Sequence, residues 1–178
     1  MSRNEIRIAG AGGQGVVTAG RILAEAAILC GKQATHSQVY GPQSRGGASR
    51  SDVVIADEEI GFPLADHVDL LIVLSGEAYT RYQPELGRDA RLIVDTGCVP
   101  GSLGGTTVAF PIVDTARSVS GGQVATGVVA LGVLQAFAEV VDAEALRQAV
   151  AARVPSKHRD MNLDALAAGM GLVGVPAP

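Results

Sequence analysis

The chain has 178 residues and a net charge of −4; 47% of its residues are hydrophobic and 18% are charged. A hydrophobic fraction of this size supplies a core and excludes a disordered chain. The negative charge, with only three Phe, three Tyr and no Trp, argues against a nucleic-acid binder or a protein of anionic membrane surfaces. The length suits one compact unit, so we predict a single domain over residues 1–178.

The two cysteines, Cys30 and Cys98, limit the metal chemistry of this chain. A cubane iron–sulfur cluster normally takes four thiolates and a structural zinc site takes four ligands, so the chain alone cannot supply a cysteine-rich cluster. The three histidines stand far apart in no metal-binding spacing, and we predict no metal site and no catalytic residue. Residues 1–13 lead straight into a strand and a glycine loop without a signal-peptide pattern, so we expect a cytoplasmic protein with reduced thiols.

Apolar runs predict the strands of a sheet. Residues 5–9 (EIRIA) alternate, whereas residues 70–74 (LLIVL) are apolar throughout, as in a strand that is buried on both faces. The predicted strands are 5–9, 33–40, 52–56, 70–74, 91–95 and 106–110. Helices predicted at 16–30, closed by Gly31, and at 77–82 alternate with these strands. This alternation predicts an α/β fold, a Rossmann-like three-layer sandwich with a largely parallel sheet.

From residue 112 onward the pattern is helical, which predicts a helical C-terminal third. Residues 124–141 are apolar nearly all round, but Thr126, Gln135 and Glu139 interrupt them. A helix buried in a core or a subunit interface therefore explains this stretch better than a membrane span does. Asp142 is a predicted N-cap of a helix that ends at Arg153, and a last helix begins at residues 155–156.

The segment GAGGQG at residues 10–15 follows a predicted strand and precedes a predicted helix, with the G-x-G-x-x-G spacing at Gly10, Gly12 and Gly15. Glycines permit a tight turn, and the N–H groups that begin the helix can receive an anion. The zone near residue 35 has no acidic residue for a ribose, and no Gly-Lys-Ser/Thr ending is present. The loop either packs the helix tightly on the sheet or a partner, or it holds a coenzyme phosphate.

A second glycine-rich block, YGPQSRGGASRSDVVI at residues 40–55, carries Arg45 and Arg50 beside a Gly-Gly pair. Two arginines among glycines and serines attract anions in an otherwise acidic chain. The alternative interpretation is a solvated loop whose glycines serve a turn.

The two blocks together resemble a known family. Residues 8–27 (IAGAGGQGVVTAGRILAEAA) and 36–57 (HSQVYGPQSRGGASRSDVVIAD) look like the gamma subunit of 2-oxoacid:ferredoxin oxidoreductases, the pyruvate/2-oxoglutarate oxidoreductase gamma family. Other features also fit, namely the strands at 70–75 and 92–95, the helix after Thr126, Lys157, Asn162 and Gly169. The chain departs from the family where an Asn often stands near the start of the long apolar helix, because here that segment reads QVATGVVALG.

The resemblance, which is greatest to the 2-oxoglutarate type, implies an accessory subunit of an oxidoreductase that is not catalytic alone. Such complexes decarboxylate a 2-oxo acid oxidatively and form an acyl-CoA, CO2 and reduced ferredoxin. Thiamine diphosphate, Mg and iron–sulfur clusters are expected in partner subunits, with coenzyme A as co-substrate and no cofactor bound by this chain alone. The expected partners are alpha and beta subunits, with a delta subunit as a further candidate, and ferredoxin through the complex.

The resemblance also selects residues that would form part of a coenzyme A site through loop N–H groups or the Arg45 guanidinium. These residues are Gly10, Gly12, Gly13, Gln14, Gly15, Tyr40, Arg45, Gly46 and Gly47. Three alternatives remain open at this point. They are the beta subunit of an indolepyruvate oxidoreductase, a free-standing Rossmann-like protein that binds a nucleotide or coenzyme, and an interaction scaffold without a ligand.

Overall fold

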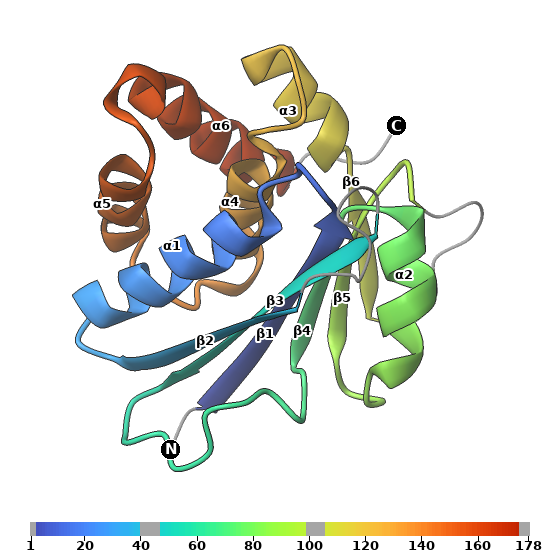
Figure 1. Cartoon of the computed structure of the whole chain (residues 1–178), viewed down its shortest axis with the longest axis vertical. Coiled ribbons are helices and arrows are strands. Elements are labelled where there is room, and N and C mark those ends of the chain that lie inside the picture. The colour runs from blue at the N-terminus through green and yellow to red at the C-terminus, as the bar shows by residue number, and fades with distance from the viewer. Residues whose placement is uncertain (1–2, 40–46, 99–105, 175–178) are drawn as a thin grey trace.

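The computed structural model describes residues 3–39, 47–98 and 106–174, and within these ranges six strands form one sheet. The strand order across the sheet is β2-β3-β1-β4-β5-β6 (Figure 1). The strands are β1 (Arg3–Ala11), β2 (Gln33–Val39), β3 (Ala48–Ala56), β4 (Leu70–Val73), β5 (Arg91–Asp95) and β6 (Thr107–Phe110). The predicted set of strands is therefore confirmed, although β1 and β3 are longer than expected.

Strand direction follows from the connections. β1, β4, β5 and β6 pair in parallel, whereas β3 pairs antiparallel with both β1 and β2. A short connection can join only antiparallel neighbours, and residues 40–47 leave no room for a crossover helix between β2 and β3. The sheet is thus largely parallel, as predicted, with β3 as its one reversed strand among the described residues.

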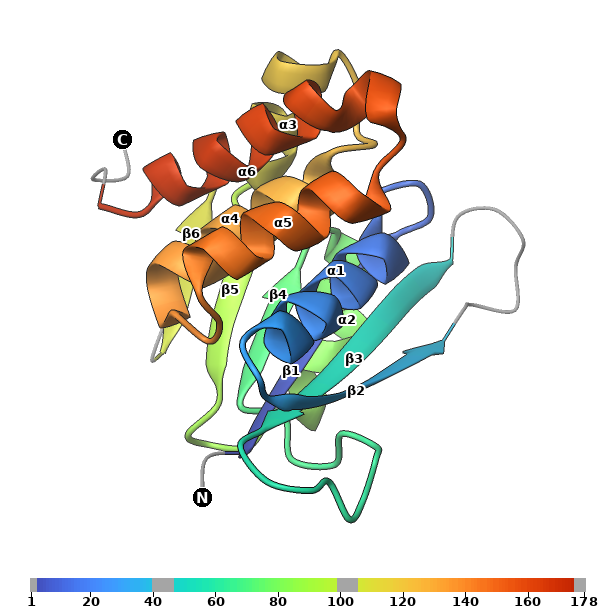
Figure 2. The same cartoon turned by 90° about the vertical axis from the view of Figure 1, so that its left-hand side faces the viewer.

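Helices cover both faces of the sheet, unequally. The larger layer contains α1 (Val16–Leu29), α3 (Ile112–Ser120), α4 (Thr126–Ala138), α5 (Ala143–Arg153) and α6 (Arg159–Leu172), the last preceded by the short η2 (Ser156–His158). The opposite face carries α2 (Gly76–Tyr82), followed by η1 (Gln83–Glu85). Figures 1 and 2 show α1 lying along the sheet, with α4, α5 and α6 packed beside and above it. This arrangement confirms the layered fold and the helical C-terminal third.

Period-two alternation divides the strand residues between the two layers. Ile6 and Ile8 of β1 belong to the apolar core beneath the larger helical layer. Ala9 of β1 and Leu71 and Val73 of β4 belong instead to the smaller core beneath α2. The uninterrupted apolar run of β4 is buried on both faces, as its composition predicts.

The apolar helix is shorter than the predicted span of 124–141. α4 ends where Glu139 takes a left-handed conformation with φ 46°, and residues 128–135 are buried on all sides. Its length of about 20 Å, at 1.5 Å per residue, falls short of the roughly 30 Å of a bilayer core. None of the helices in the described part of the chain combines the length and apolar character that a membrane crossing requires. α4 is instead the central helix of the larger layer.

Candidate functional site at the carboxyl edge of the sheet

The glycine loop joins β1 to α1, and the side chain of Gln14 holds it in shape. Gln14 Oε1 accepts a hydrogen bond from the Ala11 N–H at 2.7 Å, and Gln14 Nε2 donates to the Leu74 carbonyl at 2.9 Å. The side chain is buried, and its backbone carbonyl accepts from the Gly127 N–H of α4 at 2.8 Å. Gln14 therefore ties the loop to the ends of β1 and β4 and to the start of α4.

Three glycines in this region allow contacts that a side chain would block. A Cβ atom on Gly10 would lie 2.5 Å from Gln14 Oε1, so a side chain there would displace the amide that shapes the loop. Gly15 takes φ 74°, and a Cβ on Gly127 would lie 2.6 Å from the Gly15 carbonyl oxygen. The start of α1 and the start of α4 consequently meet backbone to backbone.

The tip of the loop faces solvent. Gly12 and Gly13 are exposed, and Gly13 has open space around it. α1 begins without a side-chain N-cap and without an acidic residue in its first turn. Its first N–H groups carry the positive end of the helix dipole, so the loop and the helix start favour an anion in this position.

The second glycine-rich block meets the first at the same edge. Ala48 pairs with Ala11 across β3 and β1, which places Gly47 beside the start of the glycine loop. The Ala48 N–H donates to Glu77 Oε1 of α2 at 3.2 Å. Tyr40, Arg45 and Gly46 lie outside the described residues. For the described part, the two sequence blocks are neighbours in space although they are distant in the chain.

A cavity of about 330 Å³ opens beside the glycine loop. Its walls combine Gly15, the residue before α1, and Thr18 of α1 with apolar side chains that include Val128 of α4 and Met161 of α6, and with the polar groups of Arg153, His158 and Asn162. Asn162 Nδ2 donates to the His158 carbonyl at 2.8 Å, and the Arg153 guanidinium pairs with a carboxylate of α1. Sequence reasoning missed this cavity, because its walls come from four segments that only the fold brings together.

Asp95 ends β5 at the same edge, and both of its carboxylate oxygens are engaged. Oδ1 accepts from the Val113 N–H at 2.7 Å and Oδ2 accepts from the Gly97 N–H at 2.9 Å, so Asp95 caps α3 and a turn. Burial, and then the charge of Asp95, raises the pKa of Cys98 to about 12. The Cys98 thiol therefore stays protonated at neutral pH and is not a nucleophile.

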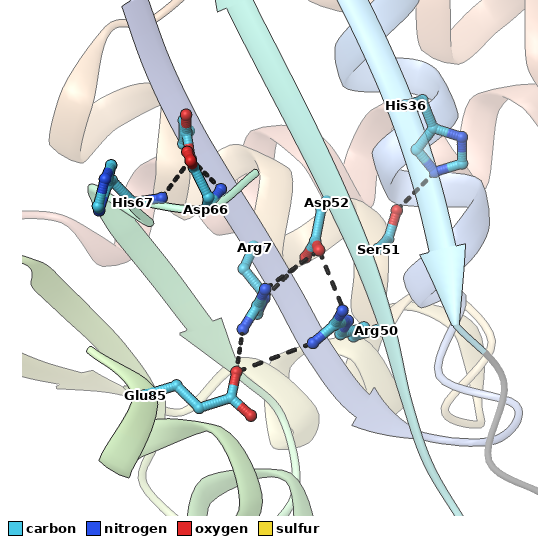
Figure 3. A network of polar contacts seen from close by, with 9 residues as sticks. Arg7, His36, Arg50, Ser51, Asp52, Asp66, His67 and Glu85 are labelled. Carbon is cyan, nitrogen blue, oxygen red and sulfur yellow. Dashed lines mark hydrogen bonds and ion pairs between the residues drawn. The ribbon is translucent and has the colours of Figure 1, made fainter. Parts of the chain in front are cut away.

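Sequence reasoning also missed a buried ionic cluster beneath α2 (Figure 3). Arg7 of β1 lies opposite Asp52 of β3, with Nε to Oδ1 at 2.7 Å, and its Nη1 reaches Glu85 Oε2 at 2.6 Å. Arg50 lies 3.5 Å from Asp52 and 3.8 Å from Glu85, and both guanidiniums approach the Tyr82 ring. Burial opposes the charge of Arg7, but Asp52 and Glu85 outweigh it and raise the pKa of Arg7. The sequence signal for this cluster was the pair of charged residues, Glu5 and Arg7, at alternate positions of a predicted strand.

The described residues contain no group of three or more His, Cys, Asp or Glu side chains that could hold a metal ion. Cys30 and Cys98 are unpaired. The groups at the carboxyl edge of the sheet are thus backbone N–H groups of a glycine loop and basic side chains beside a cavity, which can bind an anion.

The comparisons with known proteins agree with this geometry. The model of the family described as "Pyruvate ferredoxin/flavodoxin oxidoreductase" matches residues 5–172. The chain belongs to this family. It is 38% identical over 180 residues to the 2-oxoglutarate synthase subunit KorC of Methanothermobacter thermautotrophicus, with 96% of this chain and 95% of KorC covered. The resemblance seen in the two glycine-rich blocks is therefore confirmed.

Two further similarities bear on the architecture of the family. A solved keto/oxoacid ferredoxin oxidoreductase gamma subunit from Geobacter sulfurreducens matches with a TM-score of 0.85 at 41% identity, covering 97% of both chains. The ketoisovalerate oxidoreductase subunit VorA of M. thermautotrophicus is 33% identical over 168 residues, which span 92% of this chain but only 35% of VorA. The same fold thus occurs in the family both as a short subunit and as about a third of a longer polypeptide.

Proposed function

We propose that the chain is the gamma subunit of a 2-oxoacid:ferredoxin oxidoreductase of the 2-oxoglutarate type. The observation that carries this proposal is the near full-length similarity to KorC, together with the pairing of Ala11 with Ala48, where the described parts of the two glycine-rich blocks meet. The complex would convert a 2-oxo acid and coenzyme A into an acyl-CoA and CO2, with two electrons passed to ferredoxin. It would reside in the cytoplasm, in keeping with two unpaired cysteines.

The chain's own residues support an accessory role. Asp95 is used for capping, the Cys98 thiol is protonated, and no metal-binding group is present among the described residues. Thiamine diphosphate, Mg and the iron–sulfur clusters are accordingly assigned to the alpha and beta subunits or a delta subunit. Electrons would pass to ferredoxin through the clusters of that complex and not through this chain alone.

Co-expression with the candidate partner subunits tests this proposal. The purified complex should contain this chain together with larger subunits and should show iron–sulfur absorbance. It should reduce ferredoxin with 2-oxoglutarate faster than with pyruvate, 3-methyl-2-oxobutanoate or indolepyruvate. Preference for indolepyruvate would favour the beta subunit of an indolepyruvate oxidoreductase, and a stable monomer whose melting temperature rises with a nucleotide would favour a free-standing binding protein.

Within the complex, the glycine loop would contribute to the coenzyme A site. Gly12 and Gly13 are exposed, the N-cap residue of α1 is Gly15, which has no side chain to cap the first turn, and Arg153 and His158 line the neighbouring cavity. A coenzyme A phosphate is an anion of the kind that such N–H groups and guanidiniums bind. Arg45 and the neighbouring Tyr40, Gly46 and Gly47 are assigned to the same site on the resemblance of their sequence block.

Arg45→Ala in the assembled complex tests the coenzyme A site. The apparent KM for coenzyme A should rise about tenfold, as for the loss of one charge-assisted hydrogen bond, while the KM for 2-oxoglutarate stays the same. Arg117→Ala is the matched control, because Arg117 is an exposed arginine of α3 that pairs with Asp114 of the same helix. An unchanged apparent affinity for coenzyme A in Arg45→Ala would remove Arg45 from the site.

A further inference from the structure

The connection between β3 and β4, residues 57–69, lies at the amino edge of the sheet, at the end opposite to the glycine loop (Figures 1 and 2). We call it the acidic loop, because its sequence DEEIGFPLADHVD has five carboxylates and no Lys or Arg. It is longer than the roughly 12 residues beyond which loops without regular structure become uncommon and are often functional.

The backbone of the acidic loop is held by side chains of β1 and β2. The Arg3 guanidinium donates to the carbonyls of Phe62 at 3.1 Å and Leu64 at 3.1 Å. Thr35 Oγ1 donates to the Pro63 carbonyl at 2.7 Å. Three consecutive carbonyls therefore point toward the sheet, and each of them accepts a hydrogen bond.

The second half of the loop is held by a buried carboxylate. Glu5 is only 3% exposed, and its Oε2 accepts from the N–H groups of Asp66 and His67, both at 2.7 Å. Figure 3 shows these two N–H groups directed to the same oxygen. Glu5 Oε1 pairs with Arg3 Nε at 2.7 Å, so the same ion pair fixes both halves of the loop.

This fixed backbone presents two large apolar side chains to solvent. Phe62 is 52% exposed and Leu64 is 51% exposed, although the chain has only three Phe in total. Apolar side chains on an ordered loop lose little conformational freedom when they are covered, and aromatic anchors dominate the energetics of protein interfaces. The arrangement suits binding to another protein better than it suits the stability of the chain alone.

The surroundings of Phe62 define the chemistry of the partner. A hollow of about 370 Å³ beside Phe62 is lined by Arg3, Glu5, Asp66, His67 and Asp69. The five carboxylates of the loop and Glu5 outnumber the Arg3 guanidinium and the Lys32 ammonium, which lies 3.6 Å from Asp57, so the border around the apolar centre is acidic on balance. A complementary surface has an apolar depression for Phe62 and Leu64 with Lys or Arg side chains around it.

We propose that the acidic loop is a docking surface for the large catalytic chain of the complex, through an apolar depression with a basic border on that chain. The proposal rests on the proposed function for the existence of that partner. The existence of a partner chain, though not the place of its contact, is supported by VorA, in which a region like this chain makes up 35% of a longer polypeptide. In VorA the similar region and the rest of the protein belong to one polypeptide. Here the counterpart of that rest would be a separate chain, which would have to bind this chain through a non-covalent contact.

Binding kinetics test the docking surface. Immobilised wild-type chain is exposed to the purified alpha–beta subcomplex at low and at physiological ionic strength. The double variant Phe62→Ser/Leu64→Ser should bind at least about thirtyfold more weakly, mainly through faster dissociation, as expected for an interface hot spot of about 2 kcal/mol. The matched control Ile28→Ser/Leu29→Ser, at two α1 side chains with exposures of 59% and 52%, should bind within about twofold of wild type.

The charged border is tested separately. Glu58→Gln/Glu59→Gln should slow association by about threefold to tenfold at low salt and flatten its salt dependence, with little change in dissociation. Equal binding of wild type and Phe62→Ser/Leu64→Ser would overturn the docking surface while leaving the proposed function intact. Loss of self-association in that variant, with unchanged subcomplex binding, would also overturn it in favour of a second copy. Failure of the wild-type chain to bind the subcomplex would overturn both proposals.

Discussion

On the face of the sheet beneath α1 and α4 the strand side chains are mostly aliphatic, whereas on the face beneath α2 Arg7 and Asp52 are buried together. The same strands supply both faces, because alternate residues point to opposite sides. The aliphatic face has several helices above it that pack closely at glycines. The other face has one short helix and η1, and Tyr82 and Glu85 complete its cover. The face beneath α1 and α4 thus depends mainly on close packing, whereas the face beneath α2 combines a smaller apolar core with matched buried charges.

Breaking the ion pair should produce the largest loss of stability. Arg7→Met leaves the Asp52 carboxylate buried beside the more distant Arg50 guanidinium, and we expect a loss of about 3–5 kcal/mol in the free energy of unfolding. The double variant Arg7→Met/Asp52→Leu should recover most of this loss, because neither charge then remains buried. Urea denaturation of the isolated chain measures both values. A loss below about 1 kcal/mol in Arg7→Met would contradict the buried-charge account.

Disturbing the packed face should cost somewhat less. A Cβ on Gly169 of α6 would lie 2.1 Å from the Val129 carbonyl oxygen of α4, and a backbone atom cannot move aside cheaply. We expect Gly169→Ala to lose about 1–3 kcal/mol through overpacking. In the same helix Gly171 has open space, so Gly171→Ala should instead gain up to about 1 kcal/mol from helix propensity. Melting temperatures that shift in the same direction for both variants would count against this contrast.

The smallest expected effect concerns His36, a polar exception on the packed face. His36 Nε2 lies 2.7 Å from Ser51 Oγ beneath Gly20, where a Cβ would meet both side chains. Burial and then the charge of Arg21 lower the pKa of His36, while Asp52 opposes them. In the unfolded chain the pKa of His36 is near 6.5, so the unfolded state binds a proton on this imidazole more readily than the folded state does. The contribution of His36 to the free energy of unfolding should therefore be complete above about pH 6.5 and should be lost as the pH decreases.

The pH dependence is measured from the free energy of unfolding between pH 8 and pH 5. His36→Gln keeps a partner for Ser51 but cannot titrate, so its stability should decline less than that of the wild type over this range. Parallel curves for the wild type and His36→Gln would show that His36 does not contribute to the pH dependence of stability.

The sequence predicts the strand positions and the two glycine-rich blocks because these depend on local periodicity and turn chemistry. The predicted N-cap is also confirmed, since Asp142 Oδ1 accepts from the N–H groups of Glu144 and Ala145. Strand direction and pairing depend instead on contacts between distant residues. Alternation in EIRIA shows that Arg7 faces one side, but Asp52, 45 residues away, is identified only by the antiparallel register of β1 and β3.

The sequence likewise predicts only the part of the candidate site that depends on local turn chemistry. The GAGGQG spacing identifies a turn before a helix, yet the role of Gln14 requires the Leu74 carbonyl, which is 60 residues away. The cavity beside Gly15 combines segments from both ends of the chain. The acidic loop has a recognisable composition, but its ordered backbone follows from Arg3, Glu5 and Thr35, which no local pattern connects with it.

The most direct test of the account is an omission experiment with purified subunits. Coenzyme A-dependent reduction of ferredoxin by 2-oxoglutarate is measured for the complete complex, for the complex without this chain, and for this chain alone. We predict turnover only in the complete complex, with the isolated chain colourless and inactive. Turnover of a 2-oxo acid by the isolated chain, or full activity of the complex from which it is omitted, would contradict the account.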